Sequence, residues 1–401
     1  MKNKVICVHI GARSHYLFPQ ALADSGLLHV LITDVWIANK FLRRMFAHAP
    51  LRILRALAGR YSETIAATAV YSFGLHFVIR EFYLRTKYPY SWDLTIARDK
   101  LFERLALPKM HRIQGATAVL GISYTALKCF EAAKDKRLKT ILFQVDPGLS
   151  EEKIVASLRA KHQHNTTWQP APESYWKHWA QECALADTIL VNSDWSKKGL
   201  IEQGLEEEKI KVIPLPFDLE QQHKEFIRTP ILQFSRERPL RCLFLGTLAL
   251  RKGIYIVLEA AQKLKAYPIE FVLVGRSELP IDAFIGTSIR YEGLVTRKET
   301  EQYYKQADVF LFPTFSDGFG LTQLEAMAWQ LPVIATPNCG TVVQHQLNGL
   351  LIEPGNTDEL VGALKQLCTN PSDLNKYALN CLSTVEQFST EKFAADLAKL
   401  I

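Results

Sequence analysis

One stretch of the sequence decides the fold: Val309-Phe-Leu-Phe-Pro-Thr-Phe-Ser-Asp-Gly-Phe-Gly-Leu-Thr-Gln-Leu-Glu-Ala-Met-Ala328. It opens on an apolar run, continues through two glycines and ends in helix-forming residues, which predicts a buried strand, a loop and a helix. A helix that begins near Gly320 points the free backbone N–H groups of its first turn at whatever the loop holds. Because Gly318 and Gly320 let the backbone approach a ligand closely, the stretch predicts a site for a diphosphate.

Two carboxylates flank this loop. Glu325 lies three residues after Thr322, on the same face of the predicted helix, where it can accept hydrogen bonds from ribose hydroxyls. Asp317 stands before the turn, on the side where a sugar would lie. This segment alone is equally compatible with Asp317 as a turn cap and Glu325 as a solvated helix residue.

A second loop of the same kind comes earlier in the chain, Leu245-Gly-Thr-Leu-Ala-Leu-Arg-Lys-Gly253. It also follows an apolar run, and two cations precede its second glycine. The ammonium of Lys252 can neutralise a departing diphosphate. Two loops that suit one diphosphate favour the functional interpretation of Asp317 and Glu325.

Apolar runs alternate with helical stretches along the whole chain, which predicts two α/β domains with parallel sheets. We expect an N-terminal domain over residues 1–218 and a C-terminal domain over 219–384, joined by a polar connection. A C-terminal helix over about 385–401 is expected to pack back on the first domain. The predicted strands are Val5–Ile10, Val30–Thr33, Ala118–Ile122, Thr140–Val145, Thr188–Asn192, Lys211–Pro214, Leu240–Leu245, Ile269–Val274, Val309–Phe312 and Pro332–Ala335.

Composition bounds the class of protein. With 401 residues and 48% hydrophobic residues, the chain is long enough for two cores and too apolar for a disordered protein. The apolar run at residues 5–10 is short and leads into Gly11, which predicts a strand and not a signal peptide, so we expect a cytoplasmic protein. The apolar stretch from Ile65 to Ile79 is interrupted and too short for a transmembrane helix.

Positive charge is concentrated near the N-terminus. Residues 1–150 hold 22 Lys and Arg against 10 Asp and Glu, whereas the remainder is net acidic. Within residues 40–60 the cations alternate with large apolar side chains on either side of Pro50. This pattern is typical of a peripheral helix at an anionic membrane surface, and equally of an ordinary helix pair with an exposed basic face.

No metal or disulfide framework is expected. The seven cysteines are scattered and odd in number, which favours reduced cysteines in apolar surroundings. His162 and His164 are too few to hold a metal ion. The chain contains no Asp-x-Asp sequence, which argues against a diphosphate held through a carboxylate-bound divalent cation.

A set of motifs, taken in order, closely resembles the C-terminal domain of retaining GT-B glycosyltransferases of the glycosyltransferase 4 type. The motifs are Gly246–Gly253, Val274-Gly275, Tyr291–Leu294, Asp317–Ala328 and Asn348–Gly355. The resemblance implies two Rossmann-like doubly wound domains that face a central cleft, with residues 1–218 as the acceptor-side domain and residues 219–384 as the nucleotide-sugar-binding domain. It implies transfer of a sugar from a nucleotide-diphosphate donor with retention of configuration, without a metal or cofactor, to a glycan, lipid-linked or small-molecule acceptor.

The resemblance also implies the site residues. Asp317 and Glu325 correspond to the two acids that contact the donor sugar and the ribose, and Lys252 clamps the diphosphate. The family's usual arginine corresponds to Thr247, so Arg251 or Arg276 is the candidate replacement. The donor-binding residues are expected to be Gly246, Thr247, Arg251, Lys252, Gly293, Leu294, Asp317, Gly318, Phe319, Gly320, Leu321, Thr322 and Glu325, and the acceptor-side candidates are Gly11, Arg13, His15 and Asp146.

Several alternatives stay open at this level. Asp146, in Gln144-Val-Asp-Pro-Gly148, ends a predicted strand where ligands bind, but Asp-Pro-Gly is also ordinary turn punctuation. A GT-B-like epimerase or phosphorylase would use the same cleft. The missing arginine is compatible with a non-catalytic binding protein. An oxidoreductase is disfavoured because Gln323 occupies the third glycine position of its motif, and nucleic-acid binding is disfavoured because the basic residues form no known binding motif.

Overall fold

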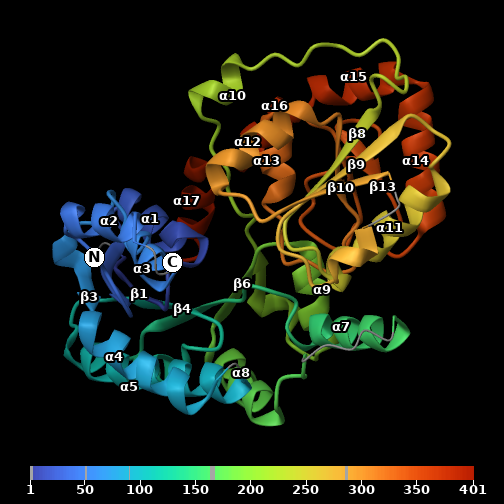
Figure 1. Cartoon of the computed structure of the whole chain (residues 1–401). Helices are drawn as coiled ribbons and strands as arrows, with labels where there is room; N and C mark the ends of the chain where they lie inside the picture. Colours follow the sequence, from blue (N-terminus) through green and yellow to red (C-terminus); the bar gives the residue numbers. More distant parts are fainter. Residues whose placement is uncertain (1–2, 50–51, 90, 163–167, 285–287) are drawn as a thin grey trace.

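The computed structural model describes the chain except residues 1–2, 50–51, 90, 163–167 and 285–287. Two parallel sheets, each covered by helices, form two lobes (Figure 1). The N-terminal sheet has the order β3-β2-β1-β4-β5-β6-β7. Its strands are β1 (Val5–His9), β2 (Leu28–Thr33), β3 (Val70–Ser72), β4 (Ala118–Ile122), β5 (Lys139–Phe143), β6 (Thr188–Val191) and β7 (Ile210–Val212).

The helices of this domain connect parallel strands. They are η1 (Arg13–Tyr16), α1 (Leu17–Asp24), α2 (Lys40–Ala47), α3 (Arg52–Ala58), η2 (Ala67–Ala69), α4 (Gly74–Lys87), α5 (Trp92–Arg112), α6 (Leu127–Asp135), α7 (Leu149–Lys161), α8 (Glu173–Leu185), α9 (Asp194–Glu202) and η3 (Glu207–Lys209). β1 and β4 are buried along their whole length, because helices cover both faces of the sheet.

The C-terminal sheet has the order β10-β9-β8-β11-β12-β13. Its strands are β8 (Leu240–Leu245), β9 (Ile269–Val274), β10 (Ile289–Gly293), β11 (Val309–Phe312), β12 (Val333–Ala335) and β13 (Gly349–Leu351). The remaining helices are α10 (Gln221–Glu225), η4 (Leu250–Lys252), α11 (Ile254–Lys263), η5 (Ile281–Phe284), α12 (Arg297–Gln306), α13 (Thr322–Ala328), α14 (Thr357–Thr369), α15 (Pro371–Leu379), α16 (Cys381–Val385), η6 (Glu386–Phe388) and α17 (Thr390–Lys399).

In each sheet the chain starts at an inner strand and builds outwards in both directions. β1 lies between β2 and β4, and β8 lies between β9 and β11. The carboxyl ends of strands at such a switch point form the crevice where open α/β sheets bind ligands. The loops after β1, β5, β8 and β11 are therefore the ones that position a site.

The predicted fold class is confirmed, and all ten predicted strands are present within two residues of their predicted bounds. β3, β10 and β13 were not predicted. β3 and β10 are edge strands with partly exposed side chains, so their sequences lack the continuous apolar run of a central strand. The predicted helix start near Gly320 lies two residues early, since α13 begins at Thr322.

The last helix returns to the first domain. α17 lies against α1, where the rings of Phe393 and Phe18 have centroids 5.1 Å apart (Figure 1). The Lys139 ammonium donates to the Leu400 carbonyl at 2.6 Å. The N-terminal domain is therefore built from both ends of the described chain.

The seven cysteines are all free and buried. Across the described residues, every helix is too short or too polar to cross a lipid bilayer.

Candidate functional site

The loop after β11 forms the seam between the two domains. The Ser193 hydroxyl, at the start of α9, donates to the Gly318 carbonyl at 2.5 Å. A Cβ on Gly318 would lie 2.5 Å from the Val145 carbonyl oxygen, and a Cβ on Gly320, which has φ +82°, would lie 2.5 Å from the Phe312 ring. Both glycines are therefore required by packing in addition to any ligand. Phe319, between them, is buried.

Lys252 and Asp317 meet at this seam. The Lys252 ammonium, from η4, forms an ion pair with the Asp317 carboxylate, from the loop after β11. Burial and the neighbouring Arg251 guanidinium lower the pKa of Lys252 to about 7, whereas the Glu151 carboxylate acts in the opposite direction. Contact with the Asp317 carboxylate also favours the charged lysine. A buried ammonium beside one carboxylate can exchange that partner for a diphosphate oxygen.

Glu325 lies in a cavity between the domains. α13 carries it, and its carboxylate accepts a hydrogen bond from the Tyr304 hydroxyl at 2.8 Å. The cavity has a volume of about 690 Å³ and is also lined by His15 of the N-terminal domain and by Leu321. The Arg297 guanidinium contacts His15 Nε2 at 3.1 Å, so one contact bridges the domains beside Glu325. Burial and Arg297 lower the pKa of His15.

The loop after β8 leaves room for a ligand. Gly246 has φ +141°, and no described atom lies within 4 Å of the place that a Cβ on it would occupy. Thr247 is exposed, and its side chain carries no charge. A Cβ on Gly275 would collide with the Gly246 carbonyl oxygen, so the loops after β8 and β9 touch through glycine backbone. This surface suits close approach of a phosphate to the backbone.

The two candidate replacement arginines lie in different places. Arg251 donates to the Ser316 carbonyl at 2.9 Å and lies 3.8 Å from the Glu151 carboxylate across the seam. Arg276 is exposed at the end of β9. The structure thus places only Arg251 beside the Lys252–Asp317 pair.

The other predicted donor residues are spread along this edge of the sheet. Gly293 ends β10 with φ +69°, and its carbonyl accepts from the Gly275 N–H at 2.7 Å. Leu294 is 75% exposed. Thr322 is the first residue of α13. The role of Gly293 and Leu294 in binding the nucleobase stays a prediction.

The loop after β1 is held by a pair of residues that sequence analysis missed. The Gly11 N–H donates to Asp34 Oδ1 at 3.0 Å, and Arg60 forms a 3.2 Å ion pair with Asp34. Arg13 lies in η1, and its side chain falls outside the described residues. Asp34 ends β2 at the same sheet edge, which is the signal that could have revealed it.

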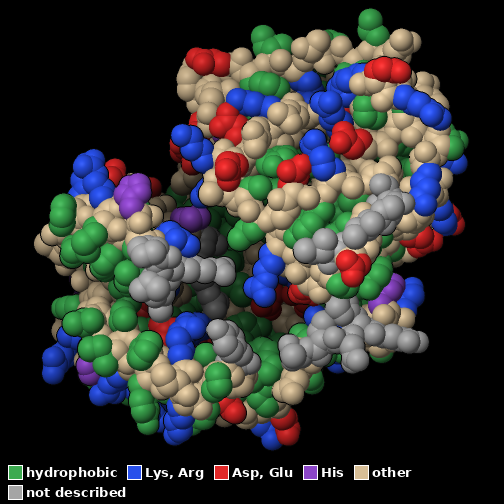
Figure 2. Space-filling view, in the orientation of Figure 1, with side chains coloured by type: hydrophobic (Ala, Val, Ile, Leu, Met, Phe, Trp, Pro, Cys, Tyr) green, Lys and Arg blue, Asp and Glu red, His purple; other side chains and the backbone are tan. Residues whose placement is uncertain are grey.

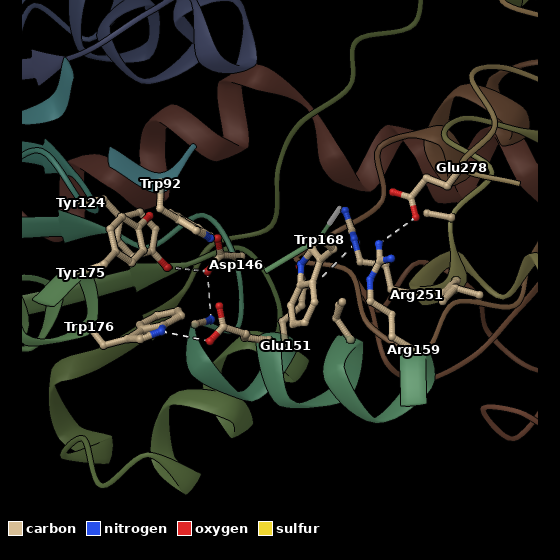
Figure 3. A pocket seen from close by; sticks show the side chains of 15 residues that line it. Trp92, Tyr124, Asp146, Glu151, Arg159, Trp168, Tyr175, Trp176, Arg251 and Glu278 are labelled. Atoms are coloured by element: carbon tan, nitrogen blue, oxygen red, sulfur yellow. Dashed lines mark hydrogen bonds and ion pairs between the residues drawn. The ribbon is translucent and has the colours of Figure 1, made fainter. Parts of the chain in front are cut away.

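Asp146 acts as a turn residue and also lines a second cavity, of about 250 Å³. Its Oδ1 accepts from the Gly148 N–H at 2.9 Å and from the Tyr124 hydroxyl at 3.0 Å. Figure 3 shows Tyr124, Tyr175 and two tryptophans on one side of this cavity, and Arg159, Arg251 and Glu278 on the other. The aromatic wall was also missed, although Trp168, Tyr175, Trp176 and Trp179 lie close together in the sequence.

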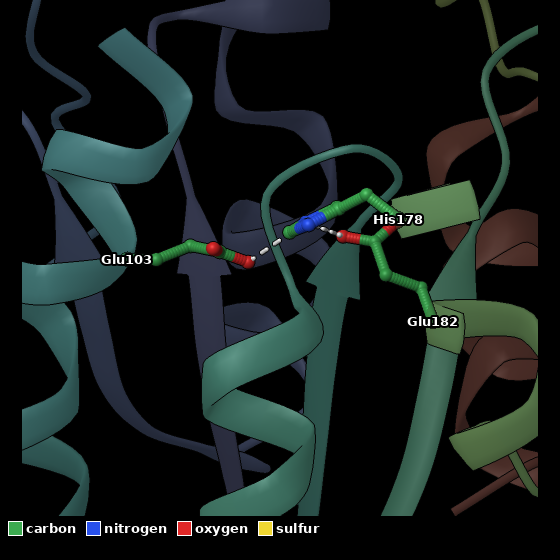
Figure 4. A group of neighbouring side chains, drawn as sticks. All are labelled: Glu103, His178 and Glu182. Atoms are coloured by element: carbon green, nitrogen blue, oxygen red, sulfur yellow. Dashed lines mark ion pairs between the residues drawn. The ribbon is translucent and has the colours of Figure 1, made fainter. Parts of the chain in front are cut away.

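A charged triad supports this aromatic wall from behind (Figure 4). His178 Nε2 lies 3.2 Å from Glu103 Oε1 and 3.6 Å from Glu182 Oε1. Burial opposes the charged imidazole, but the two carboxylates raise the pKa of His178 to about 10. Glu182 also accepts from the Tyr124 and Ala126 N–H groups, each at 2.6 Å. These three side chains are the only group of potential metal ligands that gather within the described residues.

Comparison with known sequences finds relatives that are similar mainly to the C-terminal domain. Residues 239–370 match the family described as "Glycosyl transferases group 1". The amylovoran biosynthesis glycosyltransferase AmsK of Erwinia amylovora is 25% identical over 225 residues, which cover 52% of this chain and 54% of AmsK. The D-inositol 3-phosphate glycosyltransferase of Rhodococcus erythropolis is 35% identical over 96 residues, covering 23% and 22%. The chain spans about half the length of the first curated relatives it matches.

Solved structures show the same two-domain architecture over the whole chain. Sucrose-phosphate synthase of Thermosynechococcus elongatus superimposes with a TM-score of 0.66 at 17% identity, covering 100% of this chain and 98% of that chain. HepE of Anabaena, solved in complex with UDP, gives 0.62 at 14% identity and covers 99% of both chains. These likenesses show the GT-B fold. Within this architecture, the part of the C-terminal domain over residues 239–370 is similar to the glycosyl transferases group 1 family.

Proposed function

We propose that the protein transfers a sugar from a nucleotide-diphosphate donor to an acceptor in the cleft, with retention of configuration and without a metal ion. The observation that carries the proposal is the Lys252–Asp317 pair at the domain seam. Glu325 stands in the adjoining cavity. The family match supplies the reaction class and HepE, whose solved complex holds UDP, supplies the first nucleotide to test.

The chemistry follows from these positions. The acceptor oxygen forms a bond to the anomeric carbon, and the bond from that carbon to the diphosphate oxygen breaks. The nucleoside diphosphate leaves with the electron pair, and the acceptor hydroxyl proton passes to it on the same face of the sugar. Lys252 opposes the growing negative charge on the diphosphate, which is stronger in the transition state than in the bound donor. Arg251 is proposed to supply the second cation.

The carboxylates have separate roles. Asp317 releases Lys252 to the diphosphate and accepts hydrogen bonds from the donor sugar hydroxyls. Glu325 accepts hydrogen bonds from the ribose hydroxyls, with its carboxylate oriented by Tyr304. Backbone N–H groups near Gly246 and after Gly320 complete the diphosphate site. Since cations and backbone groups balance the diphosphate charge, no divalent cation is required.

We further propose that the N-terminal domain docks on an anionic membrane surface. α2 has no buried residue, and Phe41 on it is 73% exposed. Edge strand β3 separates α2 from α4, whose Leu75 is 73% exposed and whose Ile79, Phe82 and Tyr83 are also exposed. Figure 2 shows hydrophobic side chains interspersed with Lys and Arg over this side of the domain. Apolar side chains flanked by cations suit an interface with anionic lipid.

Thermal denaturation with UDP, GDP, ADP and dTDP tests the donor site. A nucleotide at 100 times its Kd stabilises the folded protein by about 2.7 kcal/mol, so at least one of the four should raise the melting temperature. The matching nucleotide sugars then identify the donor, and NMR of the product gives its anomeric configuration. If none of the four nucleotides changes the melting temperature, the result would favour the alternative that this chain is a non-catalytic binding protein. Conversion of the donor without transfer to an acceptor would favour the epimerase alternative.

A further inference from the structure

The cavity beside Asp146 has features that the donor site does not explain. Five aromatic residues line it, and four of their rings contact one another around Tyr175. The Tyr175 ring is stacked on Tyr124, with centroids 4.7 Å apart and an interplanar angle of 16°. The Trp92 ring lies 4.9 Å and the Trp176 ring 5.4 Å from Tyr175. The rings thus form one continuous wall facing a space of about 250 Å³ (Figure 3).

The wall is fixed in orientation by the polar atoms of its rings. Trp92 Nε1 donates to the Gln169 carbonyl at 2.9 Å, and Trp176 Nε1 donates to Glu152 Oε1 at 3.2 Å. The Tyr124 hydroxyl donates to Asp146. Glu182 holds the backbone of Tyr124 from behind. A rigid aromatic surface costs little side-chain entropy when a ligand binds to it.

The opposite wall adjoins the transfer site. Arg251 immediately precedes Lys252, and Glu151 accepts from the Ser316 hydroxyl at 2.8 Å, one residue before Asp317. The cavity is therefore lined by Arg251, the chain neighbour of Lys252, and by Glu151, which contacts the chain neighbour of Asp317. A ligand in it lies next to the Lys252–Asp317 pair. That is the position an acceptor needs.

The charges of the cavity select the ligand class. Arg159 forms a 3.2 Å ion pair with Glu278, and Arg251 faces Glu151. Arg251 is assigned to the donor diphosphate in the proposed function, and Arg159 is held by Glu278, so neither cation is left for a phosphate group of the acceptor. Its other charged groups are the carboxylates of Asp146, Glu151 and Glu152, whose oxygens accept hydrogen bonds from hydroxyl groups. An aromatic surface next to such acceptors matches a pyranose ring, whose C–H face is apolar and whose rim carries hydroxyls.

We propose that this cavity is the acceptor site and that the acceptor presents a neutral sugar ring, stacked on the wall around Tyr175 with its hydroxyls toward Asp146 and Glu151. The proposal rests on the proposed function. Ligand pockets for drug-sized molecules have volumes of about 300–1,000 Å³, so a cavity of about 250 Å³ suits a single ring. The acceptor is thus a saccharide terminus and not the phosphate of a carrier.

Saturation-transfer NMR tests the site with defined probes. The intact protein, saturated with the nucleotide found by thermal denaturation, is mixed with methyl glycosides of glucose, galactose, mannose, rhamnose and N-acetylglucosamine. At least one glycoside should receive magnetisation, strongest at the ring protons of its apolar face. Glycerol phosphate is the anionic probe. Binding of glycerol phosphate in this cavity, or of none of the glycosides, overturns the proposal.

Tyr175→Leu removes the central ring, and Tyr267→Leu makes the same change on the C-terminal domain, away from the cavity. Glycoside affinity should fall about tenfold in Tyr175→Leu, the order expected for one aromatic contact, and stay unchanged in Tyr267→Leu. Trp92→Leu, at the rim, should act in the same direction and serves if Tyr175→Leu does not fold. A normal nucleotide shift in the variants separates loss of this site from failure of the donor site. Unchanged glycoside affinity in both cavity variants overturns the proposal.

Discussion

Lys252 is the residue on which the proposed transfer depends most. Lys252→Ala should lower turnover about 100- to 1000-fold, by analogy with loss of one preorganised oxyanion donor. Lys263→Ala is the matched control, because Lys263 is a lysine of the same domain that pairs with Glu259 and Asp358 at the surface. Steady-state kinetics and melting temperatures of both variants are the measurement. Normal turnover in Lys252→Ala would show that the loop after β8 does not hold the diphosphate.

The low pKa of Lys252 gives a pH signature. The ammonium is lost as pH rises through about 7 in the free enzyme, so kcat/KM for the donor should fall above that pH. Lys252→Arg keeps its charge throughout this range and should flatten the decline, even if its absolute activity is lower. Identical profiles for the two proteins would mean that another group governs the alkaline limb.

Arg251 and Arg276 allow a direct comparison of the two candidate cations. Arg251→Ala should cost nearly as much turnover as Lys252→Ala, because its guanidinium lies at the seam. Arg276→Ala should change stability by no more than about 0.5 kcal/mol and leave the rate nearly unaltered, as for an ordinary surface residue. If Arg276→Ala lost more turnover than Arg251→Ala, Arg276 at the end of β9 would be the residue that replaces the family's arginine.

Glu325 should affect binding more than folding. Glu325→Ala removes a carboxylate poised for two ribose hydroxyls, and each such charged hydrogen bond contributes about 1.5 to 3 kcal/mol. Calorimetric affinity for the free nucleotide is the measurement. Tyr304→Phe is the companion variant, since it removes only the hydroxyl that orients Glu325 and should weaken binding to a smaller extent. Wild-type affinity in Glu325→Ala contradicts the ribose assignment.

At the scale of elements, the central strands of both sheets could be predicted, whereas β7 is the one edge strand among those described that was predicted. β11 is wholly apolar, and β8 and β9 are apolar apart from Arg241 and Glu270, because helices cover both faces of their sheet. β3 carries exposed Tyr71 and lacks that signal. The motif loops could be placed after strands, but the Asp34–Arg60 pair that holds Gly11 depends on contacts far apart in sequence. The roles of the individual site residues stay predictions.

The start of α6 depends on the charged triad. Because the pKa of His178 is raised in the folded protein, the protonated imidazole stabilises the fold. This contribution to the free energy of unfolding is complete below about pH 6.5 and is lost as pH rises through about 10. His178→Gln should therefore remove this part of the pH dependence of the melting temperature. At neutral pH it should destabilise the protein by about 3–5 kcal/mol, because two buried carboxylates lose their partner. A melting profile parallel to that of the wild type would contradict this account.

At the scale of the whole molecule, the surface of α2 to α4 makes membrane docking testable. Replacing Arg43, Arg44, Arg52 and Arg55 with Gln should reduce binding to anionic liposomes, since cations near such a surface contribute about 1 kcal/mol each. Donor affinity should be unchanged. Replacing Arg236, Arg241, Lys265 and Arg290 on the C-terminal domain is the control for net charge. If the wild-type protein does not bind anionic liposomes at low salt, the membrane proposal is wrong.

The packing of α17 on α1 has a consequence for biosynthesis. Phe18 leaves the ribosome early, but its partner Phe393 lies about 375 residues further along the chain and is made much later. At about 5–20 residues per second, the apolar side of α1 remains uncovered on the nascent chain for about 20 to 75 seconds. The second domain must emerge and fold before the first can close its core. A chain whose synthesis stops before Thr390 therefore has a first domain with an open hydrophobic surface. Such a surface is a substrate for chaperones and proteases.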